Sequence, residues 1–443
     1  CSTAEATPLR MSAGAAGRTA DPYPVQPIPH PLNASVRVPG SKSLTNRALL
    51  VAALAEGVTT LTNALDSDDP RRFVESLQRL GFSVVQRPPA IVVTGLGGRI
   101  PAARAELFVG NAGTAARFLT ALLALGQGEY VLDGDARMRE RPIADLVDAL
   151  RQLGVDASSA TGCPPLRVRA AGLPGGRATV AGDLSSQFLS GLLMVAPYAQ
   201  GPLDLSVAGE LNSKPYVDMT LAVMADFGVA VEREGYERFR VRPQRYTARA
   251  DYAIESDASA ASYFFAAPAI CGGRVRVENL SRRSRQGDVA FLEVLAAMGC
   301  VVEAGEDWVA VRADGRRPLR GVDVDLRDIP DTAQTLAAIA PFAATPTTIR
   351  GIASARVKET DRVAALCAEL TRLGVTVAEH PDGLTIQPCA AFRPAVVRTY
   401  HDHRMAMALS LVGLRAPGVQ IEDPGCVSKT FPDFFAVLEA LRA

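Results

Sequence analysis

Apolar residues recur with two different periods in the first hundred positions of the chain. Residues 34–38 alternate between apolar and polar side chains, as a strand does, and the alternation stops at Pro39-Gly40. Across residues 41–56 the apolar side chains share one side of a helix, and Gly57 follows. The elements expected next are a strand at 58–61, a helix at 68–80, and strands at 82–85 and 91–93. The pattern therefore predicts a strand–helix–strand–helix–strand–strand unit.

This unit recurs along the chain, as three series of residues with the same spacing indicate. Cationic residues at the expected N-termini of helices are 71 or 73 residues apart: Arg141, Lys214, Arg285, Lys358 and Lys429. Residues at the start of the other helix of each unit are 71–73 apart: Ser43, Thr114, Ser186, Ser259, Thr332 and Met405. Glycines flanked by apolar residues end one helix per unit: Gly81, Gly154, Gly228, Gly299 and Gly374. This shared period predicts six repeats, and it is longer than the roughly 20–50 residues of most solenoid repeats.

The length of the chain indicates more than one domain. A chain of 443 residues is too long for a single hydrophobic core, so two domains of three units each are expected. Residues 1–20 are rich in Ala, Ser and Thr and contain no apolar stretch typical of a secretory signal. We expect a disordered extension of bacterial type there, with the remnant of a plastid transit peptide as the alternative.

Charge and cysteine content exclude several classes of protein. The net charge is zero, so the chain carries no general field for nucleic acid or membranes, and any anion site must be local. Seven scattered cysteines without C-x-x-C spacing argue for reduced thiols and against a disulfide framework or zinc site. No apolar run approaches the ~18 residues expected of a spanning helix.

Lysine is rare, and its positions suggest chemistry. The chain has four lysines, and each lies beside a turn or helix-start signal: Lys42, Lys214, Lys358 and Lys429. Lys358 lies in the run Arg356–Arg362, which has five charged residues in seven positions and precedes a helix expected at 363–370 with Thr360 as its cap. Helix starts favour anions, so the run indicates a ligand with several negative charges, with Glu359 as a proton donor. The alternative is a solvated helix start.

Other helix starts carry candidate ligands for anions, each with a simpler structural alternative. Gly40-Ser41-Lys42-Ser43 with Arg47, and Ser185-Ser186-Gln187, offer donors to an anion, although serines at these positions also cap helices. Gly113 would let a ligand approach the backbone, or is a plain glycine turn. Asp331 is a candidate base or an N-cap. His401 and His403 lack a partner set for a metal, so structural histidines are favoured, with Arg404 as the better ligand.

From about Val25 onward the chain carries ordered motifs that resemble one enzyme family. These are Pro39-Gly40-Ser41-Lys42-Ser43 with Asn46-Arg47, Gly110–Thr114, Arg139–Pro142, Ser185–Gln187, Ser213–Tyr216, Arg356–Arg362, Asp402–Met407 and Lys429–Asp433. Together they resemble the 5-enolpyruvylshikimate-3-phosphate synthases (3-phosphoshikimate 1-carboxyvinyltransferases), within the enolpyruvyl transferase family. The number of motifs in the same order makes the resemblance highly specific.

The resemblance implies an α/β fold: the two-domain inside-out α/β barrel of the enolpyruvyl transferases, with six βαβαββ repeats, three in each domain. It implies a first domain at residues 41–254 and a second at 22–40 plus 255–443, with 1–21 as a disordered extension. The active site is implied to lie in the cleft between the domains.

The implied reaction transfers the enolpyruvyl (carboxyvinyl) group of phosphoenolpyruvate to the 5-hydroxyl of shikimate 3-phosphate and releases phosphate, through a tetrahedral adduct. It belongs to the shikimate pathway of aromatic amino-acid biosynthesis and uses no metal or organic cofactor. The expected partners are the two substrates and the inhibitor glyphosate, without nucleic acid or membrane. We expect a cytoplasmic monomer.

Site residues are implied by their positions in the matching motifs. Asp331 is implied as the base for the hydroxyl, Glu359 as the proton donor to the methylene carbon, and Lys42 as the group that balances charge. Residues implied to bind shikimate 3-phosphate are Lys42, Ser43, Arg47, Ser185, Ser186, Gln187, Ser213, Tyr216, Asp331, Ser354 and Lys358. Residues implied to bind phosphoenolpyruvate are Lys42, Asn111, Gly113, Thr114, Arg141, Gln187, Arg362, Arg404 and Lys429. Arginines suit a carboxylate and lysines suit a phosphate.

Three residues depart from the family's pattern, and two other functions stay open. Phe118 replaces the usual proline, Thr45 a serine, and His401 an Asn or Asp. A UDP-N-acetylglucosamine enolpyruvyl transferase would share the fold but needs a reactive cysteine in a first-domain loop, which Cys163 does not match. A non-catalytic phosphosugar-binding protein on the same scaffold would need the cations but neither Asp331 nor Glu359.

Overall fold

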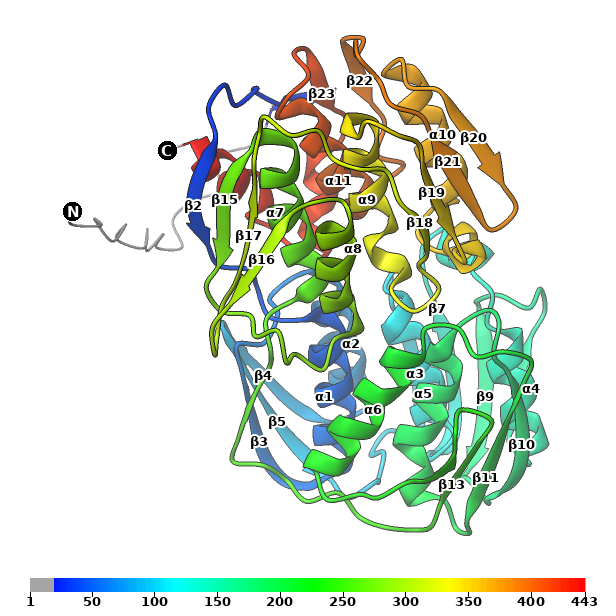
Figure 1. Ribbon diagram of the computed structural model, residues 1–443. Helices are drawn as coiled ribbons and strands as arrows, with labels where there is room; N and C mark the ends of the chain where they lie inside the picture. The colour runs from blue at the N-terminus through cyan, green and yellow to red at the C-terminus, as the bar shows by residue number, and fades with distance from the viewer. Residues whose placement is uncertain (1–19, 443) are drawn as a thin grey trace. The chain divides into compact units, whose positions relative to one another are not determined.

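The computed structural model describes residues 20–442, so most of the extension expected at residues 1–21 lies outside the described part of the chain. Two compact units are present. The first unit consists of Gly40–Glu255 together with Val357–Glu359, and the second unit consists of residues 20–39, Ser256–Arg356 and 360–442. Helices and strands alternate in both units (Figure 1), so the predicted α/β fold class is confirmed.

The first unit contains three successive sets of elements. Its elements are α1 (Lys42–Leu54), β3 (Glu56–Thr62), α2 (Asp68–Arg79), β4 (Ser83–Arg87), β5 (Ala90–Leu96), β6 (Arg104–Phe108), α3 (Gly113–Leu123), β7 (Gln127–Asp133), η1 (Met138–Glu140), α4 (Ala144–Gln152), β8 (Asp156–Ser159), β9 (Leu166–Ala171), β10 (Gly176–Ala181), α5 (Ser186–Val195), η2 (Ala196–Tyr198), β11 (Leu203–Ala208), α6 (Lys214–Asp226), β12 (Glu232–Glu234), β13 (Arg238–Val241) and β14 (Asp251–Ala253).

The second unit repeats this order and adds two strands from the start of the described chain. Its elements are β1 (Tyr23–Pro24), β2 (Leu32–Val36), α7 (Ala258–Cys271), β15 (Gly273–Val277), η3 (Gly287–Ala290), α8 (Phe291–Ala297), β16 (Val301–Ala304), β17 (Val309–Ala313), β18 (Asp323–Asp325), η4 (Pro330–Thr332), α9 (Ala333–Ile339), η5 (Ala340–Phe342), β19 (Thr347–Arg350), η6 (Ala353–Val357), α10 (Arg362–Arg372), β20 (Val377–His380), β21 (Gly383–Ile386), β22 (Ala395–Val397), α11 (His403–Gly413), β23 (Val419–Ile421), η7 (Pro424–Lys429), α12 (Phe434–Glu439) and η8 (Ala440–Arg442).

The four-stranded sheets share one strand pattern. Between residues 20 and 442 there are five four-stranded sheets and one three-stranded sheet, β1-β23-β22. In the sheet β6-β7-β9-β8 the first pair is parallel and the other two pairs are antiparallel. Two sheets take their parallel outer strand from a distant part of the sequence: β14 pairs with β3, and β2 pairs with β15. The mixed sheets therefore follow the repeat of the sequence.

Helices of two kinds lie behind the sheets. In the first unit α1, α3 and α5 contact one another, and in the second unit α7, α9 and α11 do the same. These helices are buried on nearly all sides, as helices that are apolar all round must be. The helices between them, such as α2 and α4, bury only one face. Figure 1 shows the strands at the outside of each unit and the helices inside it.

The repeated glycines end helices in the way the sequence predicts. All five have positive φ angles, between 83° and 110°: Gly81, Gly154, Gly228, Gly299 and Gly374. At Gly81 the N–H donates to the Gln78 carbonyl at 3.0 Å, and the following Phe82 N–H donates to the Leu77 carbonyl at 3.0 Å. The same two bonds recur after the other four helices. This is the Schellman motif, which glycine favours because it has no Cβ to strain a left-handed backbone.

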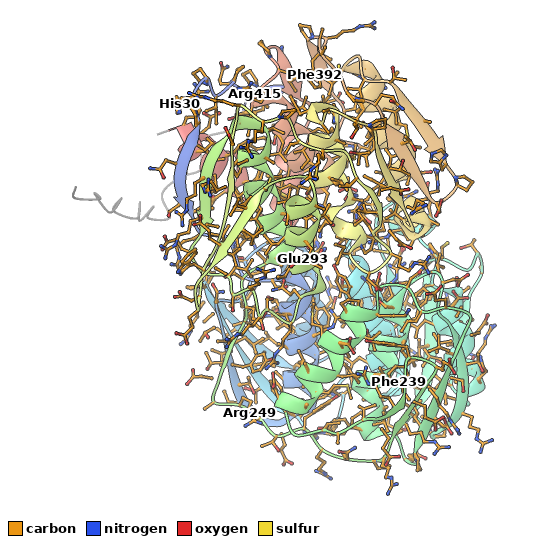
Figure 2. The ribbon with its side chains drawn as sticks, in the orientation of Figure 1. His30, Phe239, Arg249, Glu293, Phe392 and Arg415 are labelled. Carbon is orange, nitrogen blue, oxygen red and sulfur yellow. The ribbon has the colours of Figure 1, made fainter. Side chains whose placement is uncertain are left out.

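Each unit has its own hydrophobic core. The cluster of the first unit extends from Leu44 to Ile254, and that of the second unit contains Val25 and residues from Ala258 to Leu441. Phe239 of β13, labelled in Figure 2, is fully buried in the first cluster. No helix among residues 20–442 is both long and apolar enough to cross a bilayer.

Two local predictions were wrong. The cap of α10 is Asp361, whose side chain accepts a hydrogen bond from the Ala364 N–H at 3.0 Å, and not Thr360. Aspartate also caps helices better than threonine. Arg141, expected directly at the start of a helix, instead follows a short 3-10 turn that ends at Glu140, and α4 begins only at Ala144.

Candidate active site

The start of α1 brings a lysine beside a buried carboxyl group. Ser41 caps the helix by accepting a hydrogen bond from the Leu44 N–H at 3.4 Å. Lys42 is the first helical residue, is 9% exposed, and its Nζ lies 3.5 Å from Oδ2 of Asp69. Asp69 is only 2% exposed and lies in the first turn of α2. The ammonium group is therefore held in one place at a helix start.

Arg47 is a buried cation on the same helix. Its Nε donates to Oγ1 of Thr220 at 2.7 Å, and its Nη atoms donate to the carbonyls of Ser43 at 3.2 Å and Tyr216 at 3.0 Å. The guanidinium carbon lies 5.2 Å from the centre of the Phe118 ring. Within residues 20–442 no carboxylate pairs with Arg47, and burial lowers its pKa to about 10. An anionic ligand would stabilise such a charge.

The start of α3 meets a second buried arginine. Nη1 of Arg141 donates to the Asn111 carbonyl at 3.0 Å and to Oδ1 of Asn111 at 2.8 Å. Its nearest acid is Glu359, with an N···O distance of 3.7 Å, and both side chains are almost fully buried. A Cβ added to Gly113 would come within 2.3 Å of Nη2 of Arg141. Glycine is therefore required at this helix start to leave room for the arginine.

Arg117 adds a third buried guanidinium to this region. It is 4% exposed and donates to the carbonyls of Gly113 at 3.3 Å and Pro142 at 2.6 Å. Burial and the nearby charge of Arg141 lower the pKa of Arg117 to about 9. Glu359 opposes this shift, and Cys163 opposes it to a smaller extent. Two arginines beside one glutamate leave a local excess of positive charge.

The starts of α5 and α6 supply neutral donors. Ser185 caps α5 by accepting from the Gln187 N–H at 3.3 Å, so the capping alternative is correct for this serine. Nε2 of Gln187 donates to Oγ1 of Thr114 at 3.4 Å, which connects α5 with α3. Ser213 precedes α6 with a left-handed φ of 58°.

In the second unit, acids and arginines alternate around Asp331. Oδ1 of Asp331 lies 3.2 Å from Nη1 of Arg362, and Oδ2 accepts from Nη2 of Arg404 at 2.8 Å. Nε of Arg362 donates to Oδ2 of Asp402 at 2.7 Å. Asp402 is fully buried and also caps α11, accepting from the Arg404 N–H at 2.9 Å. This order of charges lets each buried group face a partner of opposite sign.

The other predicted residues of the second unit lie in short 3-10 segments. Ser354 in η6 and Lys429 in η7 are each 8% exposed. Asp331 lies inside η4, whose N-cap is Ile329, and the N-cap of α9 is Thr332, so Asp331 is not an N-cap residue. His401 is exposed and bonds to Asp423 at 2.7 Å, whereas His403 is fully buried, so the two rings do not share a site.

The predicted residues are divided between the two units. Those of the first unit are Lys42, Ser43, Arg47, Asn111, Gly113, Thr114, Arg141, Ser185, Ser186, Gln187, Ser213, Tyr216, Lys358 and Glu359, and those of the second are Asp331, Ser354, Arg362, Arg404 and Lys429. Contacts join them in small groups: Arg47 with Ser43 and Tyr216, Gln187 with Thr114, Arg141 with Asn111 and Glu359, and Asp331 with Arg362 and Arg404.

Sequence reasoning assigned no role to Asp69, Arg117 or Asp402. Asp402 stands beside Arg404 in one of the quoted motifs, and Arg117 follows Gly113 by one helical turn, so both positions gave a signal. Cys163, considered for a reactive role, is half-buried, and burial raises its pKa. That is the opposite of an activated thiolate.

Each unit holds groups that suit a small anion and proton transfer, with Glu359 in the first unit and Asp331 in the second. Ammonium and guanidinium groups at helix starts bind phosphate and carboxylate, and Asp331 and Glu359 are carboxyl groups held next to them. Among residues 20–442, no three His, Cys, Asp or Glu side chains gather in a way that could hold a metal ion.

Comparisons with known proteins agree with these features. The sequence model of the family "EPSP synthase (3-phosphoshikimate 1-carboxyvinyltransferase)" matches residues 27–438. The chain is 50% identical over 420 residues to the 3-phosphoshikimate 1-carboxyvinyltransferase of Trichormus variabilis, a match that covers 94% of this chain and 98% of the relative. It is 51% identical over 414 residues to that of Shewanella sp. (strain MR-7), covering 92% and 96%. A solved EPSP synthase from Acinetobacter baumannii is similar with a TM-score of 0.77 and 26% identity, covering 94% of this chain and 97% of that one. This chain therefore belongs to the EPSP synthase family, the 3-phosphoshikimate 1-carboxyvinyltransferases.

Proposed function

We propose that this chain carries out the EPSP synthase reaction of the shikimate pathway with the residues described above. In this reaction the 5-hydroxyl oxygen of shikimate 3-phosphate bonds to C2 of phosphoenolpyruvate, and phosphate then leaves from the same carbon. The observation that carries the assignment is the group Asp331, Arg362 and Arg404, because it joins a carboxyl base to two carboxylate-binding arginines.

Binding of phosphoenolpyruvate is proposed to involve charged groups from both units. Arg362 and Arg404 would take its carboxylate, while Lys42, Arg141 and Lys429 would take its phosphate. The remaining proposed contacts are Asn111, Gly113, Thr114 and Gln187. The buried positive excess around Arg141 supports this role, since a dianionic phosphate would neutralise it.

Binding of shikimate 3-phosphate is proposed to centre on Arg47. This cation is held by neutral oxygens and aromatic rings, and its charge would be balanced by the ring carboxylate or phosphate of the substrate. The other proposed contacts are Lys42, Ser43, Ser185, Ser186, Gln187, Ser213, Tyr216, Asp331, Ser354 and Lys358.

Acid and base roles are proposed for two carboxyl groups. Asp331 takes the hydroxyl proton as the new C–O bond forms, and Glu359 gives a proton to the methylene carbon, which produces the tetrahedral adduct. In the second step the methyl group returns a proton and the C–O bond to phosphate breaks. Arg404 donates to Asp331 at 2.8 Å, so a substrate carboxylate that engages Arg404 would release Asp331 to the hydroxyl.

We also propose the finer architecture of the family for this chain. Two domains, at residues 41–254 and at 22–40 plus 255–443, would form the inside-out α/β barrel and meet around the substrates. The compact units and the repeated sheets support this division. Small-angle scattering would test it: both substrates together should lower the radius of gyration, and an unchanged radius would contradict closure.

The relatives named above are bacterial, which supports the cytoplasm as the location. We also propose that the protein is a monomer, and light scattering at assay concentrations would test that state.

The decisive experiment measures phosphate release and binding separately. Metal-free protein should release phosphate only when both substrates are present. Asp331→Asn and Glu359→Gln should each lower kcat about 100- to 10,000-fold, the usual contribution of a general acid or base. Calorimetry should still detect binding of shikimate 3-phosphate to both variants. Wild-type turnover in either variant would remove the acid–base assignment, and turnover by neither variant nor wild type would remove the activity itself.

A further inference from the structure

A buried carboxyl group outside the assigned site holds the loop that leads into α11. Glu369 of α10 is fully buried. Its Oε1 accepts from the Tyr400 hydroxyl at 2.8 Å, and its Oε2 accepts from the Arg398 backbone N–H at 3.0 Å and from Nε of Arg372 at 2.9 Å. Both carboxyl oxygens are therefore occupied, and two of the three donors belong to residues 398–402.

This loop has an unfavourable backbone conformation at two adjacent residues. Tyr400 and His401 have φ angles of 55° and 53°, which side chains other than glycine rarely adopt. The Asp402 N–H donates to the Thr399 carbonyl at 2.9 Å, so the turn is tight. Because two adjacent residues are in the left-handed region, external contacts must hold the loop in this shape.

The contacts come from a single face of α10. Arg362 and Glu369 are seven residues apart, which places them on the same side of the helix two turns from each other. Arg362 binds Asp402 at 2.7 Å, and Glu369 binds Tyr400 at 2.8 Å. Helix α10 thus holds the loop at two points. Beyond the second point the chain enters α11, whose second residue is Arg404.

We propose that Glu369 and Tyr400 are positioning residues for the phosphoenolpyruvate carboxylate. By fixing the left-handed turn, they set the place of Asp402, and Asp402 in turn orients Arg362 through its side chain and Arg404 through the helix cap. The inference rests on the proposed role of Arg362 and Arg404 in binding this substrate.

Burial and the bond to Glu369 also raise the pKa of Tyr400 to about 12, so its hydroxyl keeps its proton and remains a donor throughout the neutral range. Tyr400 is 37% exposed, and its ring can be retained while the hydroxyl alone is removed. Tyr400→Phe therefore removes the contact without emptying space in the core.

The test compares Tyr400→Phe with a matched variant elsewhere. Tyr252→Phe removes a bond of the same length, 2.8 Å from the Tyr252 hydroxyl to Oδ2 of Asp226, in the first unit. We expect Tyr400→Phe to raise the KM for phosphoenolpyruvate about 10-fold, the effect of one lost hydrogen bond to a charged group. The KM for shikimate 3-phosphate should change less than about 2-fold, and Tyr252→Phe should leave both KM values unchanged.

A second variant guards against a purely structural explanation. Glu369→Gln keeps an acceptor for Tyr400 but turns an NH2 group toward the Arg398 N–H and Arg372, so it should raise the same KM by more than Tyr400→Phe does. If both variants lower thermal stability while the KM for phosphoenolpyruvate stays at the wild-type value, the positioning role is wrong.

Arg404→Ala separates this proposal from the site assignment on which it rests. An unchanged KM for phosphoenolpyruvate in Arg404→Ala would overturn the assignment of the carboxylate site. A large rise in Arg404→Ala with no rise in Tyr400→Phe or Glu369→Gln would overturn the positioning role alone.

Discussion

Replacement of Gly113 by alanine tests whether the close packing of Arg141 against the start of α3 is needed for substrate binding. The added Cβ would lie 2.3 Å from Nη2, 2.8 Å from Cζ and 3.0 Å from Nη1 of Arg141. Because non-bonded carbon and nitrogen atoms approach to about 3.4 Å, the guanidinium group must retreat by about 1 Å. It cannot retreat freely, since the side chain is buried and bonded to Asn111 and close to Glu359.

The size of the effect follows from those contacts. A retreat of about 1 Å is enough to break a bond as short as the 2.8 Å contact with Oδ1 of Asn111, because hydrogen bonds do not extend past about 3.5 Å. Loss of one bond to a charged group costs about 1.5–3 kcal/mol. If Arg141 binds the phosphate of phosphoenolpyruvate, the KM for this substrate should rise about 10- to 150-fold.

Steady-state phosphate release at saturating shikimate 3-phosphate measures this KM. Gly191→Ala is the matched control, because it is another glycine in a buried helix whose added Cβ would lie 3.3 Å from the nearest atoms, Cβ of Ala121 and the carbonyl oxygen of Arg117. That contact can be relieved by small shifts, and alanine favours a helix by about 0.5–1 kcal/mol over glycine, so the control should keep the wild-type KM.

Binding of shikimate 3-phosphate alone, measured by calorimetry, should be unchanged in Gly113→Ala. A wild-type KM for phosphoenolpyruvate in this variant would refute the reasoning. So would a crystal structure in which the methyl group is accommodated and Arg141 has not moved.

Two further predictions concern stability in the two units. Asp402→Asn should lower the free energy of unfolding of the second unit by about 3 kcal/mol, because it breaks a buried ion pair with Arg362. Urea unfolding followed by the fluorescence of Trp308, the single tryptophan of the chain, measures this decrease. Asp204→Asn should destabilise the first unit above about pH 4 and have little effect near pH 2. Hydrogen bonds from Arg238 lower the pKa of Asp204 to about 2, below its unfolded value, so the stabilisation by the carboxylate exists above about pH 4 and disappears as the pH falls toward 2. Acid unfolding followed by circular dichroism should show wild type losing about 1–2 kcal/mol more than Asp204→Asn across that range, and equal losses would contradict the assignment.

Much of the fold was predictable because its signals are local. Gly81 and its four counterparts end helices through backbone bonds that span only six residues, so their spacing was one of the three series that predicted the repeat. The buried lysine at position 42 was also visible, since lysine is rare in this chain and Lys42 follows a capping serine.

The charge partners could not be predicted, because packing and not sequence distance selects them. Asp69 is 27 residues from Lys42, and Asp402 is 40 residues from Arg362, as their positions in the chain show. Neither aspartate differs locally from an ordinary helix cap. The prediction of the N-cap of α10 was wrong for a related reason. Thr360 and Asp361 are adjacent and both residue types can cap a helix, so only the backbone conformation decides between them.

The pairing of outer strands with strands far away in the sequence has a consequence for folding during synthesis. Strand β2, at Leu32–Val36, pairs with β15 at Gly273–Val277, so its partner is translated roughly 240 residues later. At about 5–20 residues per second, the nascent chain carries β2 without that partner for about 12–50 s. The first unit can close its own sheets in this interval, because β14, the last strand it needs, ends at Ala253. During this time β2 exposes unpaired backbone N–H and C=O groups, which can pair with other chains until Val277 has emerged.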